Sequence, residues 1–187
     1  MFFSNYFLNQ ISIQILTEFS SINPPLEFIF TQLPVLKPRH YSISSSSLTQ
    51  SAFQIDLTVA VIQYYTESGY RHYGVCSNFL NDKPIGGDVF AFIRSAPNFR
   101  LPKERKVPII MVGPGTGIAP FRSFWEHRIK LKELNPSADY GKMTLFFGCR
   151  YPSMQLYREE IETAMLNNVI KDYHVAYSRQ PNQPKVI

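Results

Sequence analysis

The sequence has 187 residues, of which 44% are hydrophobic and 18% are charged, a composition typical of a folded globular protein and not of a disordered chain. Nineteen Lys and Arg against fourteen Asp and Glu give a net charge of +5, which suits an anionic ligand or an acidic partner protein. The positive charges form no basic run, so the composition gives no reason to expect nucleic-acid binding.

Cysteine usage and the apolar N-terminus indicate an intracellular protein. Cys76 and Cys149 lie far apart, and neither they nor the four scattered histidines match the spacing of a disulfide framework or a metal site. The apolar stretch Met1 to Leu16 is broken by polar residues, and no Lys or Arg precedes Lys37, so the positive start of a signal peptide is missing. No apolar run reaches the ~20 residues of a membrane-spanning helix. We therefore expect a cytoplasmic location.

The first elements predicted along the chain are one helix and one strand. Ile11 to Phe19 repeats apolar residues at helical spacing, and Pro24-Pro25 follows to end that helix. Arg39 to Ser46 alternates, with Tyr41 and Ile43 on one face and serines on the other. This alternation predicts a half-buried strand with the aromatic and apolar side chains inward.

A longer alternating stretch follows the serines. Ser44 to Ser51 would also suit a low-complexity linker, although the alternation starts before the serines do. Phe53 to Tyr65 alternates throughout and predicts a second strand. Thr66 to Gly69 has the residues of a turn.

The next forty residues contain short elements joined by turns. Gly74 to Leu80 has the pattern of a loop that opens a short helix, with Ser77 near its start. Gly86 to Asp88 predicts another turn, and Val89 to Arg94 alternates as a strand. Asn98 to Val107 is a charged, proline-containing connection, and we place a domain boundary within it.

The second half changes to strands that alternate with helices. We expect strands over Pro108–Val112, Met143–Phe147 and Tyr173–Tyr177, and helices over Pro120–Leu134 and Ser153–Asn167. This order predicts a parallel sheet with right-handed crossovers, which binds ligands at the carboxyl ends of its strands. The chain therefore predicts an antiparallel β domain followed by an α/β domain.

Glycines at alternate positions follow the first strand of the second half, at Gly113, Gly115 and Gly117. Glycine lets the backbone turn sharply and approach a ligand closely. A helix start beyond it offers unpaired N–H groups to an anion such as a phosphate. The spacing is not the usual dinucleotide fingerprint, and an ordinary tight turn would also select these glycines.

Five motifs in one order carry a resemblance to a known family. They are Arg39-His40-Tyr41-Ser42-Ile43-Ser44-Ser45-Ser46, Gly74-Val75-Cys76-Ser77, Gly113 to Phe121, Phe147-Gly148-Cys149-Arg150 and Ala176-Tyr177-Ser178-Arg179. In this order they resemble the ferredoxin–NADP reductase-like module of the diflavin reductases. Within that group the chain is most similar to the C-terminal FAD/NADPH reductase region of the nitric oxide synthase family. The NADPH–cytochrome P450 reductase type is the alternative.

The resemblance implies an FAD site in the first half. Arg39 would pair with the FAD pyrophosphate, because its planar fork bonds phosphate oxygens in pairs, and Tyr41 would stack on the flavin ring. Ser42 would lie at the reactive edge of the flavin and assist hydride transfer. The remaining residues implied at the FAD are His40, where the family commonly has tyrosine, Thr58 and Ala60 beside the flavin, and Gly74, Val75, Cys76 and Ser77 over the pyrophosphate.

The resemblance also implies an NADP site in the second half. Gly115 and Thr116 would face the pyrophosphate and nicotinamide half of NADPH, and Arg150 would lie near its adenosine end. Ser178, Arg179 and Lys185 match the family's site for the 2′-phosphate, which distinguishes NADP from NAD.

The implied architecture is a partial antiparallel β-barrel FAD domain over residues 13–103, then a partial doubly wound α/β NADP domain over 104–187, with 1–12 unassigned. The implied function is hydride transfer from NADPH to FAD within the electron supply to the haem of a nitric oxide synthase. FMN, haem and calmodulin belong to other parts of such a protein, as do its FMN and oxygenase domains as partners. Because the family's sheet continues beyond the position of Ile187, we expect weak or no turnover from this polypeptide alone. A non-catalytic module that binds a nucleotide or a partner is therefore the remaining alternative.

Overall fold

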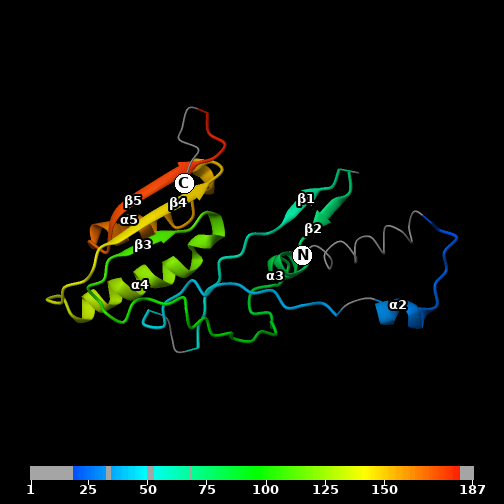
Figure 1. Ribbon diagram of the computed structural model, residues 1–187, viewed down its shortest axis with the longest axis horizontal. Helices are drawn as coiled ribbons and strands as arrows, with labels where there is room; N and C mark the ends of the chain where they lie inside the picture. Colours follow the sequence, from blue (N-terminus) through cyan, green and yellow to red (C-terminus); the bar gives the residue numbers. More distant parts are fainter. Residues whose placement is uncertain (1–18, 33–34, 50–52, 68, 182–187) are drawn as a thin grey trace. The chain divides into compact units, whose positions relative to one another are not determined.

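The structure is a computed structural model that describes residues 19–32, 35–49, 53–67 and 69–181 (Figure 1). Its contacts divide the chain into two units, Met1–Arg39 and His40–Ile187. In the first unit, helix α2 spans Leu26–Gln32, and the backbone N–H groups of Phe28 and Ile29 in its first turn donate to the carbonyl of Pro25. The helix predicted over Ile11 to Phe19 lies outside the described residues except for its last residue.

The second unit contains a three-stranded parallel sheet in the order β3-β4-β5 (Figure 1). Strand β3 spans Ile109–Val112, β4 spans Met143–Cys149 and β5 spans Ile170–Tyr177. Helix α4, Ala119–Leu134, connects the first pair of strands, and α5, Arg158–Leu166, connects the second pair. The parallel α/β organisation predicted for the second half is therefore confirmed.

One hydrophobic core lies between this sheet and its two helices. Alternate strand residues point into it, as the period of a strand requires, and the helices contribute from their facing sides. Its fully buried large side chains include Met111, Met143, Leu145, Phe147, Ile161, Ile170 and the single tryptophan, Trp125. On the other side of the sheet Ile110 and Val112 stay 72% and 52% exposed.

The helix predicted over Pro120–Leu134 is confirmed as α4, whereas α5 starts later than the sequence pattern predicts. A 3-10 turn, Gly115–Ile118, precedes α4, and a second one, Pro152–Met154, stands in front of α5. The helix predicted from Ser153 begins only at Arg158, because Tyr157 takes a left-handed conformation with φ 56°. A residue in that conformation interrupts a right-handed helix.

An antiparallel hairpin and a short helix lie earlier in the second unit. Strands β1, Gln63–Tyr65, and β2, Arg71–Tyr73, pair in antiparallel register, and helix α3 spans Val75–Asn81. The Gly69 N–H donates to the Thr66 carbonyl at 2.9 Å, and Gly69 has φ +82°, which glycine adopts without strain. The predicted turn and the short helix are both confirmed.

The two long strands predicted before this hairpin are wrong over most of their length. The predicted Arg39–Ser46 strand contributes one isolated bridge, from Ile43 to Leu57, and only the last three residues of Phe53–Tyr65 form a strand. The burial is also inverted, since Ile43 is 38% exposed and Ser44 is fully buried. The buried serines are held by hydrogen bonds from distant segments, which the local alternation of the sequence does not reveal.

The strand predicted over Val89 to Arg94 is also wrong. In the part of the chain that the structure describes, this stretch pairs with no other strand, and Phe90 is completely exposed. Strand structure needs a neighbour that supplies hydrogen bonds. In the described residues, the first half thus contains a hairpin, one bridge and the two short helices α2 and α3, and they form no closed barrel.

Candidate functional site

A cavity of about 750 Å³ opens in the second unit at the carboxyl ends of the parallel strands. One wall is the extended segment from Thr58 to Tyr64, and another is the glycine turn after β3. The ends of β4 and β5 complete it. The lining includes Thr58, Ala60, Gly115, Thr116, Cys149, Arg150 and Ser178.

Two residues of the glycine turn, Gly113 and Gly115, require glycine for different physical reasons. A Cβ on Gly113 would lie 2.7 Å from the Gly117 carbonyl oxygen and 2.9 Å from the Phe121 ring, so a larger residue would force the turn apart. Gly115 has φ +53°, and nothing lies within 4 Å of its Cβ position. Gly115 is therefore selected for backbone conformation, and its open side leaves room for a ligand in the cavity it lines.

The strands β4 and β5 continue to pair beyond their last residues. The Ser178 N–H donates to the Cys149 carbonyl at 2.9 Å, and the Arg179 N–H donates to the Arg150 carbonyl at 3.1 Å. This pairing brings the backbones of two exposed arginines together, and Arg150 lines the cavity. An arginine carries a fixed positive charge and paired donors, which suit a phosphate.

Cys149 lines the cavity as a neutral thiol. Burial raises its pKa, while a backbone hydrogen bond at Tyr151 works in the opposite direction and is the smaller effect. Its Sγ donates to the Tyr151 carbonyl at 3.2 Å. A raised pKa keeps the thiolate scarce at neutral pH, and thiolate is the reactive form. Cys149 is therefore suited to packing and not to nucleophilic chemistry.

Gln155 joins two tyrosines of β5 beside the cavity. Its Nε2 donates to the Tyr173 hydroxyl at 2.9 Å, and the Tyr177 hydroxyl donates to its Oε1 at 3.1 Å. Burial is the main reason that the pKa of Tyr173 is raised to about 12. This bridge fixes the loop before α5 to the strand that carries Ser178.

The Tyr173 pKa predicts a pH dependence of stability. A tyrosine whose pKa is higher in the folded state than in the unfolded state, about 10, stabilises the fold fully below pH 10 and loses that contribution as the pH rises toward 12. We expect Tyr173→Phe to flatten the fall in unfolding free energy over this interval, measured by urea denaturation at several pH values. Tyr70→Phe, which replaces a 69% exposed tyrosine, is the control and should leave the fall unchanged.

The extended wall of the cavity is fixed to the start of α3. The Gly74 N–H donates to the Ile62 carbonyl at 2.8 Å, and the Ile62 N–H donates to the Ser77 hydroxyl at 3.1 Å. A Cβ on Gly74 would lie 2.8 Å from both Ile62 and Ser77 side-chain atoms. The Ser77 hydroxyl is buried and already bonded, so its local function is to hold this wall.

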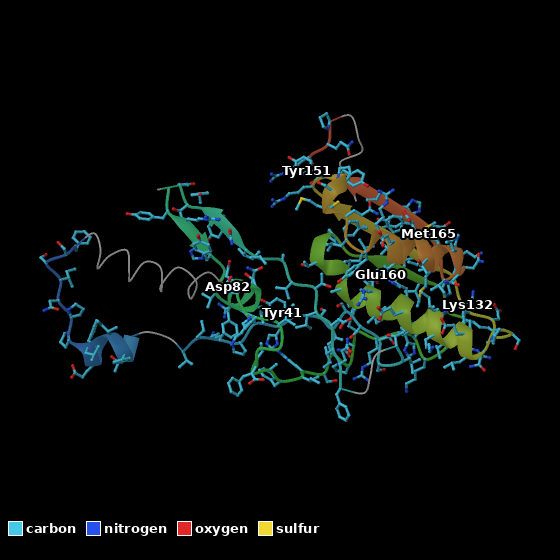
Figure 2. All side chains as sticks on the ribbon, turned by 180° about the vertical axis from the view of Figure 1, so that it is seen from behind. Tyr41, Asp82, Lys132, Tyr151, Glu160 and Met165 are labelled. Carbon is cyan, nitrogen blue, oxygen red and sulfur yellow. The ribbon has the colours of Figure 1, made fainter. Side chains whose placement is uncertain are left out.

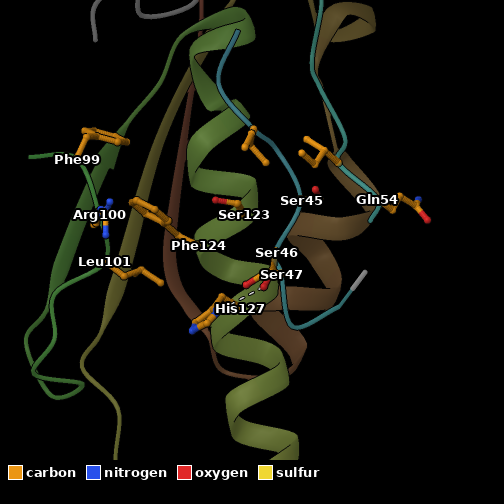
Figure 3. Close-up of a pocket in the computed structure, with 12 residues that line it drawn as sticks. Ser45, Ser46, Ser47, Gln54, Phe99, Arg100, Leu101, Ser123, Phe124 and His127 are labelled. Carbon is orange, nitrogen blue, oxygen red and sulfur yellow. Dashed lines mark hydrogen bonds between the residues drawn. The ribbon is translucent and has the colours of Figure 1, made fainter. Parts of the chain in front are cut away.

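A second cavity of about 650 Å³ is lined in part by the serine segment, residues 44–49 (Figure 3). Phe99 and Phe124 stack at its edge with ring centroids 5.7 Å apart, and the Ser46 hydroxyl lies 3.2 Å from His127 Nδ1. Burial, and next the charge of Arg128, lower the pKa of His127, which keeps the imidazole neutral at pH 7. None of the residues predicted at FAD or NADP lines this cavity.

The first cavity brings together six of the predicted site residues: Thr58, Ala60, Gly115, Thr116, Arg150 and Ser178. Arg179 adjoins it through the backbone bond to Arg150. The others line neither cavity: Tyr41 is half-buried, His40 and Ser42 are exposed, Gly74, Val75, Cys76 and Ser77 lie at the start of α3, and Arg39 ends the first unit. Lys185 lies outside the described residues. The roles predicted for individual residues stay predictions.

Comparison with known families assigns both halves. Residues 4–79 match the FAD binding domain family, and residues 111–186 match the oxidoreductase NAD-binding domain family. The two matches occur in the predicted order, and the second contains the glycine turn and the arginine pair. The chain therefore contains FAD-binding and NAD-binding oxidoreductase domains. The first match begins inside the stretch 1–12 that was left unassigned, and the boundary predicted at residues 103 and 104 stays a prediction.

Similarity to individual known proteins specifies the kind of oxidoreductase further. The chain is 49% identical over 177 residues to the inducible nitric oxide synthase of Gallus gallus, and the aligned residues make up 93% of this chain and 15% of that protein. It is 48% identical over 174 residues to a nitric oxide synthase-like protein of Bombyx mori, covering 92% and 16%. It is 44% identical over 187 residues to the inducible nitric oxide synthase of Oryctolagus cuniculus, covering 98% and 37%.

The resemblance to the nitric oxide synthase reductase region is therefore confirmed, as are the FAD- and NAD(P)-binding domains. The chain spans between 15% and 37% of the length of these relatives. In the part that the structure describes, no helix is both long and apolar enough to cross a bilayer, and no three His, Cys, Asp or Glu side chains gather as metal ligands.

Sequence reasoning missed the most connected charged residue of the oxidoreductase, Arg122. This arginine follows the glycine turn on α4, and its side chain is only 13% exposed. An arginine on an amphipathic helix looks like an ordinary surface residue in the sequence. Glu126 at i+4 is an ordinary helical partner, but Glu160, Asp56 and Ser44 lie 38, 66 and 78 residues away, which leaves no local signal of the cluster.

Proposed function

We propose that this chain binds FAD and NADPH and transfers a hydride from the nicotinamide to the flavin. The observation that supports this most is the first cavity, where Thr58 and Ala60 face Gly115 and Thr116 across one space. The FAD-binding match covers the first wall, and the NAD-binding match covers the second. A hydride donor and its acceptor must meet in such a space, because transfer requires the reacting atoms about 3–3.5 Å apart.

The chain's residues suit the two groups. Bound FAD supplies an acceptor for the two electrons and one proton of a hydride, which oxidises NADPH to NADP⁺. The small side chain of Ala60 and the open side of Gly115 let flat rings approach the backbone closely. Arg150 and Arg179 offer paired donors to a phosphate. We assign Ser42 to the hydride-transfer edge of the flavin, with Tyr41 on its ring and Arg39 at its pyrophosphate.

The whole protein would pass electrons from FAD through FMN to a haem for nitric oxide synthesis. The identity of 44–49% to nitric oxide synthases over more than nine-tenths of this chain supports that choice over the cytochrome P450 reductase type. The FMN and oxygenase domains would be its partners, and calmodulin would act elsewhere in the protein. The antiparallel barrel belongs to this proposal, as does a cytoplasmic location, which the free thiols Cys76 and Cys149 suit.

The test is an absorption spectrum of the purified chain with FAD, followed by anaerobic titration with NADPH. We expect flavin absorbance in the protein fraction after gel filtration, and slow bleaching of that absorbance on addition of NADPH, in line with the weak turnover expected of this polypeptide alone. Flavin that co-elutes and is not bleached would reduce the assignment to nucleotide binding without turnover. A protein fraction that retains no flavin would overturn the proposal for this polypeptide.

A further inference from the structure

Arg122 is the centre of a charge cluster that the sequence patterns do not show. Its guanidinium contacts three carboxylates, with Nη1 3.2 Å from Asp56, Nη2 2.8 Å from Glu126 and Nε 2.7 Å from Glu160. Nη1 also donates to the Ser44 carbonyl at 3.1 Å, and Nη2 to the second oxygen of Glu160 at 3.2 Å. An arginine has five N–H donors, and these five contacts use all of them.

The cluster holds Arg122 in one orientation. Below the guanidinium lies the ring of Tyr157, whose centroid is 4.9 Å from the Arg122 Cζ, and Figure 2 shows Glu160 beside α4. Burial lowers the pKa of Arg122, but the hydrogen bond with Glu160 and the charges of Glu126 and Glu160 raise it above its ordinary value. The group is therefore a permanent cation with a fixed fork.

The partners of Arg122 belong to three separate segments. Asp56 lies just before the cavity wall that starts at Thr58, and the Ser44 N–H donates to its carbonyl, whereas Glu126 lies on α4 and Glu160 on α5. The same stretch is also joined to the helices by a hydrogen bond between the hydroxyls of Thr58 and Tyr157. Arg122 thus fastens the chain that carries Thr58 and Ala60 onto the domain that carries the glycine turn.

Glu126 extends the connection along the serine segment. Its Oε2 accepts from the Ser46 N–H at 2.9 Å and from the Thr49 hydroxyl at 3.1 Å, while its Oε1 holds Arg122. A further hydrogen bond joins Asp56 to the serine segment, because the Asp56 N–H donates to the Ser45 hydroxyl at 2.9 Å. A shift of Arg122 would therefore move the entire segment and not one side chain.

We propose that Arg122 is a positioning residue for hydride transfer, because it sets how closely the Thr58–Ala60 wall stands to the glycine turn. The proposal rests on the proposed function, since it concerns the approach of the flavin to the nicotinamide. Arg122 does not line the cavity and is not assigned contact with either cofactor. It acts through the segment that it holds.

The variant that tests this is Arg122→Lys, which keeps the positive charge and removes the planar fork. A lysine offers three donors from one atom and cannot hold three carboxylates and a carbonyl at once. Arg158→Lys is the matched control, because the Arg158 side chain is 71% exposed and forms its ion pair with Glu162, one helical turn away. The same chemical change at that site leaves the cavity walls untouched.

Two measurements give the outcome. In stopped-flow mixing of the FAD-loaded chain with NADPH, we expect flavin reduction to slow by roughly tenfold to a hundredfold in Arg122→Lys, since a misplacement of about 1 Å costs up to about a hundredfold. NADP⁺ binding should change by less than about threefold, because the glycine turn and the arginine pair are intact. Arg158→Lys should match the wild type in both measurements.

Hydrogen–deuterium exchange of the chain without cofactors provides the second readout. We expect faster exchange over residues 42–49 and 53–60 in Arg122→Lys, where the Ser44 N–H donates to the Asp56 carbonyl, and unchanged exchange in β4. Equal reduction rates and equal exchange in variant and wild type would overturn the inference. So would faster exchange across β4 together with lost NADP⁺ binding, because Arg122 would then support the whole fold. A wild-type flavin that NADPH leaves oxidised would overturn the proposed function.

Discussion

Phe147→Ala is expected to lower the free energy of unfolding of the second unit by about 3–5 kcal/mol, the usual cost of removing a buried phenylalanine side chain. Phe147 is fully buried on β4 within the core formed by the sheet, α4 and α5. Domains of this size are stable by only about 5–15 kcal/mol, so the variant should retain little stability at 37 °C. Urea denaturation followed by the fluorescence of Trp125, the only tryptophan, would measure the loss.

Phe53→Ala is the matched control for that experiment, because it makes the same chemical change at a side chain that is 99% exposed. Surface substitutions usually change stability by no more than about 0.5 kcal/mol. The sequence pattern predicts a strand that begins at Phe53, whereas the structure leaves this side chain in solvent. A loss of several kcal/mol from Phe53→Ala would contradict the structure, and equal stability of Phe147→Ala and the wild type would contradict the position of the core.

The α/β half could be predicted from the sequence because its signals are local. Apolar runs such as Ile109–Val112 suit strands buried on a parallel sheet, and the glycine turn between that run and α4 is specified by the space around Gly113. The boundaries were harder. The left-handed conformation of Tyr157 delays α5 by about one turn, and no residue type in that stretch announces it.

The first half could not be predicted in the same way, because its order depends on partners far away in the sequence. The alternation around Ser44 indicated a strand with serines outward, but the serines are buried, and the Ser44 carbonyl accepts from Arg122. Val89–Arg94 has a strand pattern without a pairing strand in the described chain. Alternation reports which side chains are apolar, and it does not supply the neighbour that makes a ladder.

The candidate site was likewise predictable only where its signals are local in the sequence. Motifs that combine a turn with a strand end, such as Gly115-Thr116 and Ser178-Arg179, were found from the sequence, because backbone geometry places them at one edge of the sheet. The side chains that align this edge with the opposite wall were not found. Arg122, Glu126 and Glu160 read as a charged helix surface until the fold brings Asp56 to them.

Arg179→Gln is expected to weaken NADP⁺ binding by roughly tenfold to a hundredfold and to leave NAD⁺ binding nearly unchanged. A charge-assisted hydrogen bond contributes about 1.5–3 kcal/mol, and each 1.4 kcal/mol is about a factor of ten. The Arg179 backbone is fixed by its bond to the Arg150 carbonyl, so the substitution removes the charge without moving the strand end. Isothermal titration calorimetry with both nucleotides would measure the selectivity.

Arg150→Gln is the companion variant that distinguishes a shared phosphate clamp from a single contact. Because the backbones of Arg150 and Arg179 pair directly, both side chains could bind one 2′-phosphate, in which case the two substitutions would lower NADP⁺ affinity by less in combination than the sum of their separate effects. An Arg150 that serves the adenosine end would instead weaken NADP⁺ and NAD⁺ alike. Equal losses of affinity for NADP⁺ and NAD⁺ from Arg179→Gln would place the 2′-phosphate site away from the end of β5. If only Arg179→Gln changes the ratio of the two affinities, that one side chain distinguishes NADP from NAD.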